Sequence, residues 1–416
     1  MRIIILGAGV VGTTTAYFLA KDGHNVTVIE RQNSPGKETS FANGGFISKL
    51  TVKPWAHPSV PKSLLRNLFR EDAPYLFRLR PDIAQWIWAA RFLSHCNQKS
   101  YNQGRHMSLR LADYSFTYLK KISLLEGLEF DNQSQGIIEL YKTQESLDQA
   151  ASFSQKLPNS EDHPKVLNMN QTIKLEPALK GQIDSYSGTL FYQGEETGDA
   201  YKFTTSLANR ANNLGVKFSF GDTVKNINVD NGCVSGVTTY KTTLRADAVV
   251  VSLGSYSTEL LRQIGIKVPI FPLKGYSITL PIDDKASAPT HGIHEIPRRI
   301  VLSNLGDRIR CAGTAELTGF DNTIRLKRTD PILADTIRLF GNIGDPKNVQ
   351  RWAGLRPMTP DCLPIIGQSR IKGLFLNTGH GSTGWTWACG SGRIIADIVN
   401  GKEAEIDISP LKPDRF

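Results

Sequence analysis

Three glycines near the N-terminus have the spacing of a nucleotide-binding turn. Gly7, Gly9 and Gly12 follow the apolar run Ile3–Leu6 and open a helical pattern, and Glu30 stands eighteen residues after Gly12. The first glycine would form the turn, the second would let a pyrophosphate approach the backbone, and the third would let helix and strand pack closely. The helix N-terminus would add partial positive charge for the phosphates. The spacing therefore predicts a dinucleotide site.

Two further glycine turns indicate which dinucleotide is bound. Val249–Ser255 is an apolar strand that ends in a turn at Gly254, and Asn377–Trp385 is typical of a strand, a glycine turn and a helix start. In flavoproteins such a final helix directs its N-terminus at the flavin C2 carbonyl and stabilises the negative charge of the reduced ring. An NAD enzyme has no need of this element, so the sequence predicts FAD. Glu30 would bind the ribose hydroxyls, and the predicted contacts of this half of FAD are Gly7, Ala8, Gly9, Val10, Val11, Gly12, Glu30, Arg31 and Gly254.

The elements between these turns are of two kinds. Residues 51–125 are rich in helical patterns, whereas a second α/β stretch begins near Gly188. Residues 268–315 alternate in a way that predicts an antiparallel sheet. The nucleotide signatures lie at both ends and in the middle of the chain. We therefore expect an α/β plus α+β protein whose Rossmann-like domain is assembled from discontinuous segments.

Five segments resemble the bacterial FAD-dependent D-amino acid dehydrogenases, which belong to the wider group of glycine oxidase, D-amino acid oxidase and sarcosine oxidase. They are Glu38–Gly45, Gly194–Asp199, Pro272–Ser277, Gly354–Asp361 and Asn377–Trp385. The resemblance runs in the same order from residue 1 to about residue 400. It implies an FAD domain made of three chain segments and a substrate domain whose antiparallel sheet lies over the flavin. We assign residues 1–52, 186–262 and 345–416 to the FAD-binding domain, and 53–185 and 263–344 to the substrate domain.

The resemblance also implies roles for individual residues. Arg356 matches the arginine that binds the substrate carboxylate, and a planar guanidinium suits this bidentate role. Its alternative is a structural salt bridge beneath the flavin. Tyr276 is the candidate that closes the substrate pocket, with a core tyrosine as its alternative. The remaining expected FAD contacts are Ser40, Asn43, Gly44 and Gly45 beside the ring, Val224 at the adenine, and Ser382, Thr383, Gly384 and Trp385 at the pyrimidine edge.

Two features limit what the resemblance implies. The segment His291–Arg299 departs from the usual family sequence, and because we expect it to line the pocket, it leaves the identity of the substrate open. Position 354 is a glycine where sarcosine oxidases carry the cysteine that bonds to flavin. We therefore expect noncovalent FAD.

The predicted reaction is the oxidative deamination of a small D-amino acid, with hydride transfer from Cα to flavin N5. The substrate amine must be neutral, and the imino acid product hydrolyses to a keto acid and ammonia. One alternative is an enzyme of the same group that acts on glycine, sarcosine or D-hydroxyproline. Another is a flavin-containing RNA-modifying protein, which a pI of about 9.3 permits. No RNA-binding module is recognisable, so no nucleic-acid partner is expected.

Charge and cysteine content bear on location. Ten basic and three acidic residues fall within positions 51–110, interleaved with aromatic residues. This pattern suits an anionic surface, so we expect a peripheral protein on the cytoplasmic side of the inner membrane that passes electrons to a quinone. The alternative is a helical region with a solvated basic face. The five cysteines are scattered without a CxxC pair, and the N-terminus has no signal-peptide pattern, so we expect neither disulfides nor a metal site.

Overall fold

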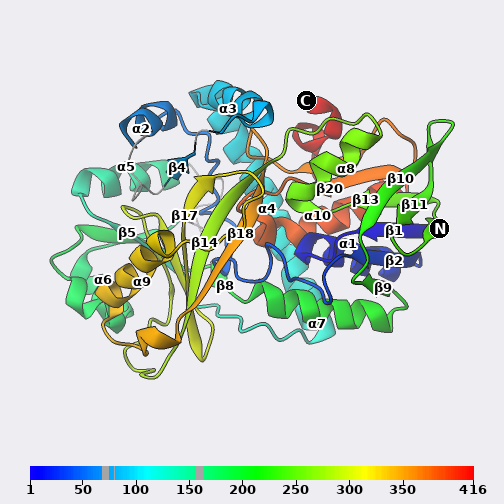
Figure 1. Ribbon diagram of the computed structural model, residues 1–416. Helices are drawn as coiled ribbons and strands as arrows, with labels where there is room; N and C mark the ends of the chain where they lie inside the picture. Colours follow the sequence, from blue (N-terminus) through cyan, green and yellow to red (C-terminus); the bar gives the residue numbers. More distant parts are fainter. Residues whose placement is uncertain (68–74, 79, 156–162) are drawn as a thin grey trace.

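The computed structural model describes residues 1–67, 75–78, 80–155 and 163–416. One lobe is built on a six-stranded sheet, drawn at the right of Figure 1. Its strands, in spatial order, are β19 (Ile365–Gln368), β20 (Leu374–Thr378), β13 (Ala248–Val251), β1 (Arg2–Leu6), β2 (Asn25–Glu30) and β9 (Lys217–Phe220). All neighbours run parallel except β19 and β20. Because the central strands are buried on both faces, they are nearly continuous apolar runs.

Side chains alternate between the two faces of this sheet. Ile3 and Ile5 of β1 pack on one face against α1 (Val10–Lys21), α4 (Gln98–Glu126), α7 (Ala200–Asn213) and α10 (Gly384–Val399). Ile4 and Leu6 pack on the other face in a second cluster. The elements of that cluster are β10 (Val224–Asp230), β11 (Cys233–Thr239), β12 (Thr243–Arg245) and α8 (Ser257–Gln263). The sheet is therefore the middle of three layers.

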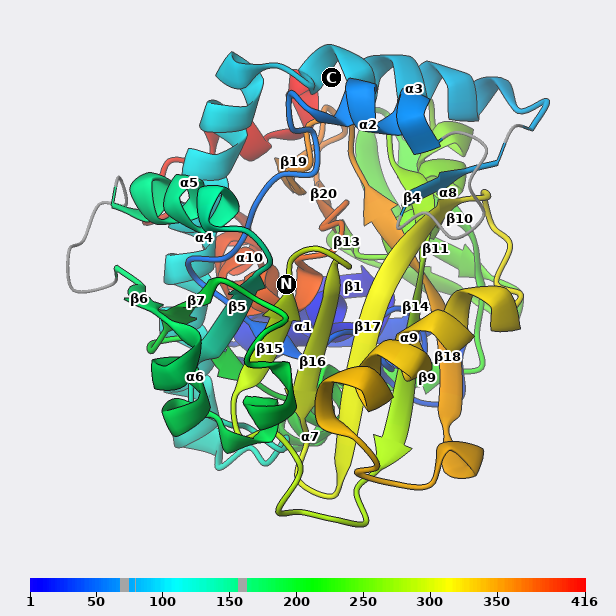
Figure 2. The ribbon, with the colours of Figure 1, turned by 90° about the vertical axis from the view of Figure 1, so that its left-hand side faces the viewer.

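The second lobe is built on a nine-stranded, mostly antiparallel sheet. Its order is β18 (Gln350–Met358), β14 (Phe271–Pro281), β17 (Arg308–Leu317), β16 (Ile300–Asn304), β15 (Gly292–Glu295), β5 (Ile137–Tyr141), β7 (Gly188–Tyr192) and β6 (Lys165–Leu167), with β4 (Tyr75–Phe77) paired to β17. Figure 2 shows α9 (Leu326–Phe340) across the outer face of β14, β17 and β18. The adjoining α6 (Met169–Leu175) and the 3-10 helix Pro177–Gln182 pack into the same core.

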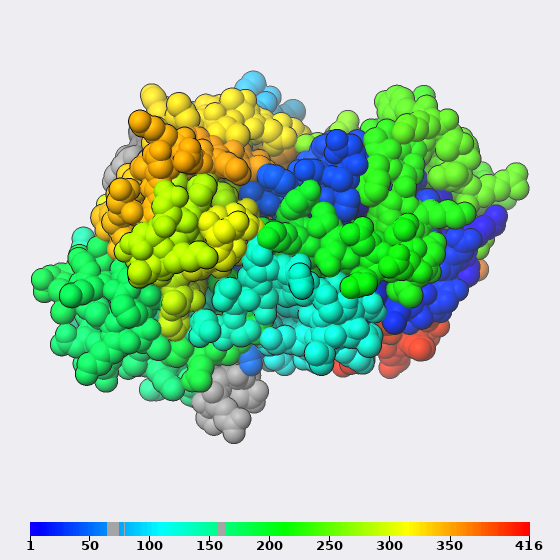
Figure 3. All heavy atoms as spheres, turned by 90° about the horizontal axis from the view of Figure 1, so that it is seen from below, coloured from blue at the N-terminus to red at the C-terminus, as the bar shows by residue number. Residues whose placement is uncertain are grey.

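Short elements join the lobes. β3 (Phe46–Ile47) pairs with β8 (Glu196–Thr197), while α2 (Val60–Asn67), α3 (Ile83–His95) and α5 (Gln144–Ser154) lie around the second lobe. In the space-filling view of Figure 3, the cyan part of the chain, which includes α4, lies between the green segments of the two lobes. The predicted fold class is confirmed: strands from distant segments form one Rossmann-like sheet, and a separate sheet is largely antiparallel.

Three elements do not belong with the domain to which their residue ranges were assigned from the sequence. β7 and β18 fall within the ranges assigned to FAD binding, yet both belong to the nine-stranded sheet. α4 falls within a range assigned to the substrate domain, yet it packs along α10. The apolar pattern of a strand does not specify its partner, because pairing is decided by register over the whole strand. β18, for example, pairs with β14 along nine consecutive residues.

Candidate active site

A cavity of about 1000 Å³ runs between the two lobes. Its first end lies over the carboxyl edge of the parallel strands, where ligands bind in open α/β sheets. Gly7, Gly9, Glu30 and Val224 line this end, while Arg356 and Trp55 line the other. The cavity therefore connects the predicted nucleotide site with the predicted substrate site.

The turn before α1 has no room for side chains. A Cβ on Gly12 would lie 1.9 Å from the carbonyl oxygen of Gly7, and a Cβ on Gly7, whose φ is +99°, would lie 2.7 Å from the carbonyl oxygen of Ser252. Gly9 caps α1 without any side-chain hydrogen bond. The Val10 amide contacts the Ser40 hydroxyl at 3.1 Å. A helix N-terminus preceded by such a glycine turn is suited to a pyrophosphate.

Glu30 stands beside the turn at the end of β2. Its carboxylate accepts hydrogen bonds of 2.8 Å from the amides of Ala8 and Gln32. Burial raises the pKa of Glu30, although these two bonds act in the opposite direction. Arg31 makes an ion pair of 2.6 Å with Glu38. Val224 begins β10 on the neighbouring wall of the cavity, and Gly254 lies in its lining at a φ of +54°.

The loop 42–45 is fixed by four hydrogen bonds to its successive carbonyl groups. Hydroxyls of Ser277 and Ser303 donate to Ala42 and Gly44, each at 2.7 Å. The Arg310 guanidinium donates to Asn43 at 3.4 Å, and an amide donates to Gly45 at 2.8 Å. Three of these donors come from the nine-stranded sheet. The second lobe therefore fixes the conformation of a loop that the sequence assigned to the flavin ring.

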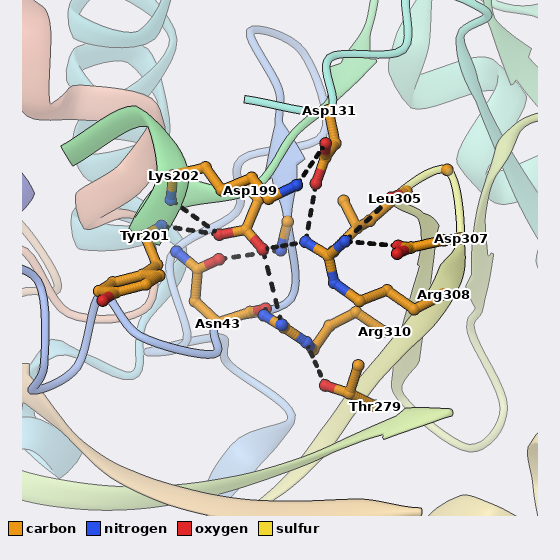
Figure 4. Close-up of polar contacts among 12 residues, drawn as sticks. Asn43, Asp131, Asp199, Tyr201, Lys202, Thr279, Leu305, Asp307, Arg308 and Arg310 are labelled. Carbon is orange, nitrogen blue, oxygen red and sulfur yellow. Dashed lines mark hydrogen bonds and ion pairs between the residues drawn. The ribbon is translucent and has the colours of Figure 1, made fainter. Parts of the chain in front are cut away.

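Figure 4 shows the charged network that supports this loop. Asp199 caps α7 and accepts from Arg308 at 2.7 Å, while Arg310 lies 3.7 Å from the same carboxylate oxygen. Burial lowers the pKa of Arg310, whereas in Arg308 the bonds to Asp199, Asp307 and Asp131 outweigh burial and raise the pKa. The network joins α7 of one lobe to β17 of the other. Sequence reasoning did not assign these arginines to the site.

The N-terminus of α10 lines the middle of the cavity with Ser382, Thr383 and Gly384. Thr383 leaves the first amides of the helix without a side-chain cap. Burial lowers the pKa of His380, just before it, to about 3, so the imidazole is neutral at physiological pH. The side chain of Trp385 lies in the core, with its ring 4.7 Å from that of Phe203. The uncapped amides fit the flavin pyrimidine edge predicted here.

Arg356 lies flat against a neighbouring strand. A Cβ on Gly275 of β14 would lie 2.3 Å from the guanidinium carbon, so only glycine leaves space for it. The guanidinium donates to the Thr314 carbonyl at 3.1 Å and stands 5.5 Å from the centre of the Trp55 ring. Burial lowers the pKa of Arg356 to about 10, which leaves it charged near neutral pH. Within the described chain it has no carboxylate partner.

Tyr276 is among the residues that line the cavity, but its ring does not lie where a residue that closes the pocket is expected. Its ring belongs to the core between the sheet and α9, and its hydroxyl donates to Glu316 at 2.6 Å. Lys274 is buried on the same side, 3.0 Å from Asp321. Successive residues of a strand face opposite sides, so Gly275 faces the cavity and its two neighbours face the core. Tyr276 is thus the core tyrosine that was its alternative.

Other side chains form the end of the cavity around Arg356, which the sequence predicts to bind the substrate. As the sequence predicted, the segment His291–Arg299 lines it, through His294, Ile296 and Arg299. Behind His294 the buried Glu139 lies 3.1 Å from its Nδ1 and 3.3 Å from the Lys53 ammonium. Burial alone would raise the pKa of Glu139, but the charge of Lys53 and the hydrogen bond with His294 outweigh it and hold the pKa well below its usual range. The aromatic wall was missed because Trp55 and Tyr75 belong to a region with no local motif.

The comparisons with known proteins agree with this geometry. The family described as FAD dependent oxidoreductase matches residues 2–398. The chain therefore belongs to the FAD-dependent oxidoreductase family. A protein of Rhizobium rhizogenes named D-amino acid dehydrogenase is 44% identical over 100% of both chains. Another of that name, from Cereibacter sphaeroides, is 42% identical over 100% of this chain and 95% of its own.

Solved structures share the fold of this FAD-dependent oxidoreductase at low identity. A glycine oxidase of Geobacillus kaustophilus has a TM-score of 0.76 at 20% identity, over 100% of this chain and 99% of its own. An L-proline dehydrogenase of P. horikoshii has a TM-score of 0.77 at 19% identity, over 100% and 97%. The turn formed by Gly7, Gly9 and Gly12, the N-termini of α1 and α10, whose N-cap residues form no side-chain cap, and Glu30 are together suited to FAD. In the part of the chain that the structure describes, no group of three His, Cys, Asp or Glu residues could hold a metal ion.

Proposed function

We propose that the enzyme catalyses the oxidative deamination of small D-amino acids. The observation that carries the proposal is the position of Arg356, a charged guanidinium at the substrate end of the cavity, paired with no carboxylate of the described residues. A guanidinium in this setting is suited to the carboxylate of a small acid. The names of relatives that are 42–44% identical along the whole chain support an amino acid of the D configuration.

The protein residues position the substrate and exclude water. FAD, when bound, supplies the hydride acceptor at flavin N5. Arg356 holds the α-carboxylate, and the Trp55 ring beside it forms an apolar wall that displaces solvent. Arg356 also gives this end of the cavity a positive potential, which favours the neutral form of the substrate amine. The amine proton leaves to solvent, and the imino acid is hydrolysed to a keto acid and ammonia.

Anaerobic reduction of the bound flavin tests this function. The purified enzyme is mixed with D-alanine, L-alanine, glycine, sarcosine and D-hydroxyproline, and the loss of the oxidised flavin absorbance is followed. Bleaching by D-alanine and not by its L enantiomer is expected. Faster bleaching by glycine, sarcosine or D-hydroxyproline would assign the chain to the corresponding activity of the wider group. No bleaching by any of the five would contradict an amine-oxidising function.

We further propose that the electrons pass to a quinone while the enzyme lies on the inner face of the membrane. The support is the outer side of α3, where Ile83, Trp86, Ile87 and Leu93 are all exposed. Their spacing puts them on one helix face, and exposed Arg91 adds a positive charge near it. No helix of the described residues is both long and apolar enough to cross a bilayer.

Several of the ten basic residues within positions 51–110 are already paired or buried, so fewer than ten can contact lipid. Arg78 pairs with buried Glu316 at 3.0 Å, Arg80 donates to the carbonyl of Thr318, and Lys53 pairs with Glu139. Arg105 is buried over the Phe153 ring. Arg70, Glu71 and Asp72 lie outside the described residues. Lys62, Arg91 and Lys99 are exposed and make none of these contacts, and these are the ones we assign to anionic lipid.

A further inference from the structure

A second guanidinium stands at the edge of the cavity. Arg299 ends the turn between β15 and β16, and its φ of +58° lies in the left-handed region that few residues other than glycine adopt. Its amide donates to the Glu295 carbonyl at 2.8 Å and closes the turn. The guanidinium carbon lies 4.3 Å from the centre of the Tyr75 ring. Arg299 is an exposed residue that lines the cavity.

Two aromatic rings connect Arg299 with Arg356. The ring centres of Trp55 and Tyr75 are 5.2 Å apart, and each guanidinium lies over one of them. Burial raises the pKa of Tyr75, and both guanidiniums act against this effect. The pKa of His57, on the same wall, is lowered by burial and then by Arg299. The guanidiniums of Arg299 and Arg356 therefore both contribute positive potential at the same end of the cavity.

No acidic side chain of the described residues pairs with Arg299. The next residue along the chain, Arg298, differs in this respect, because it binds Asp335 at 3.1 Å. The acids that line the cavity lie toward the nucleotide end, and they are Glu30, Glu38, Asp222 and Glu259. The α-carboxylate of one substrate molecule compensates one guanidinium. The other remains without a counter-charge.

We propose that Arg299 binds a carboxylate on the side chain of the substrate, so that the enzyme prefers acidic D-amino acids such as D-aspartate and D-glutamate. This inference rests on the proposed function and names its substrate class. Arg356 takes the α-carboxylate, and the Trp55 and Tyr75 rings pack along the methylene groups between the two anionic ends. A neutral amide of the same shape keeps the packing and loses the ionic contact.

The test compares acids with their amides. Steady-state rates with a soluble dye are measured for D-aspartate against D-asparagine, D-glutamate against D-glutamine, and D-alanine. We expect kcat/KM to favour at least one acid over its amide by about 10-fold. Arg299→Gln should remove that preference mainly through KM and leave D-alanine turnover within about 2-fold. The matched variant Arg298→Gln should retain the preference.

Three results would overturn the inference. They are no preference of the wild-type enzyme for either acid, retention of the preference by Arg299→Gln, and an equal loss of D-alanine and acid turnover in a variant whose flavin spectrum stays that of wild type. A variant that does not bind FAD leaves the wild-type ratio of acid to amide as the deciding measurement. Turnover of D-alanine without an acid preference would refute only this inference. Failure of every D-amino acid to reduce the flavin would refute the proposed function as well.

Discussion

The contacts of Arg356 predict how its replacement changes the activity of the enzyme. The side chain donates to one carbonyl and lines the cavity, so the alanine variant should still fold and bind FAD. We expect Arg356→Ala to lower kcat/KM for D-amino acids by at least ~100-fold, because a desolvated charge pair is lost. Arg356→Lys should recover only part of this, since a lysine offers one point charge in place of a planar fork. Normal flavin bleaching by the alanine variant would show that Arg356 has another role.

Gly354 indicates that FAD is bound without a covalent bond. A Cβ at this position would lie 2.0 Å from the ring of Trp352, so the backbone is covered by an indole and a cysteine would not fit without rearrangement. Acid or heat should therefore release free FAD and leave colourless protein, as measured by absorbance after precipitation. Yellow fluorescence that migrates with the denatured polypeptide on a gel would contradict noncovalent binding.

For single residues, sequence reasoning succeeded where the residue acts through its local backbone. Gly7, Gly9 and Gly12 are required by a turn that is complete within a few residues, so their spacing alone indicated their role. Tyr276 was misplaced for a different reason. β14 is buried on both faces and its pairing with β17 shifts between Gly275 and Tyr276, so no polar alternation tells which side chains face the cavity.

Among the elements, the short connection between β7 and β8 contains an unusual acid. Glu195 is fully buried and accepts hydrogen bonds from the Lys49 and Leu50 amides at 3.0 and 2.9 Å. Burial raises the pKa of this carboxyl from 4.5 to about 7. Between these two pH values the folded protein holds a proton that the unfolded chain has released. The free energy of unfolding should therefore fall as the pH rises through this window.

Thermal unfolding of the FAD-bound protein between pH 5 and pH 7.5 measures this effect. Glu195→Gln keeps an acceptor oxygen for both amides and removes the titrating group, so we expect its Tm to vary less with pH than that of wild type. Exposed Glu129, changed to Gln, provides the control and should leave the wild-type slope. Equal slopes for wild type and Glu195→Gln would show that the proton is not bound there.

The loop 42–45 shows why elements are harder to place than motifs. Its sequence suggested proximity to the flavin, and its own residues include Asn43, whose side chain accepts from the Gly45 amide at 3.0 Å. The donors that fix its carbonyl groups, however, are Ser277, Ser303 and Arg310, more than 230 residues away along the chain. Serine and arginine are common on strands, and no spacing marks these three as a group. Only the register of the sheet brings them together.

For the whole molecule, the exposed face of α3 predicts behaviour toward lipid. The protein should co-sediment with anionic vesicles and bind zwitterionic vesicles weakly, because each basic residue near a charged bilayer contributes about 1 kcal/mol. Salt at ~1 M, which limits electrostatic range to ~3 Å, should leave a remainder due to the apolar side chains. Ile83→Ser with Ile87→Ser should remove this remainder and slow quinone reduction. Turnover with a soluble dye should not change.

Leu124 and Leu125, which are also exposed but lie at the far end of α4, provide the matched control. Changing both to serine removes a similar apolar area, and vesicle binding should persist. If wild-type protein ignores anionic vesicles, the region around α3 is only a solvated face. A soluble acceptor or oxygen would then take the electrons.

The order of strands in the six-stranded sheet also determines when the protein can acquire its cofactor. β1 is made first, but its neighbour β13 follows about 240 residues later, and β20 and α10 are near the C-terminal end. A nascent chain therefore emerges from the ribosome with its glycine turn and β2 but without β13, the neighbour of β1 on its other side. Such distant pairings form slowly and leave apolar strand edges open to association in the meantime. We expect FAD to bind only after synthesis is nearly complete, so that the supply of flavin and of chaperones limits the yield of active enzyme.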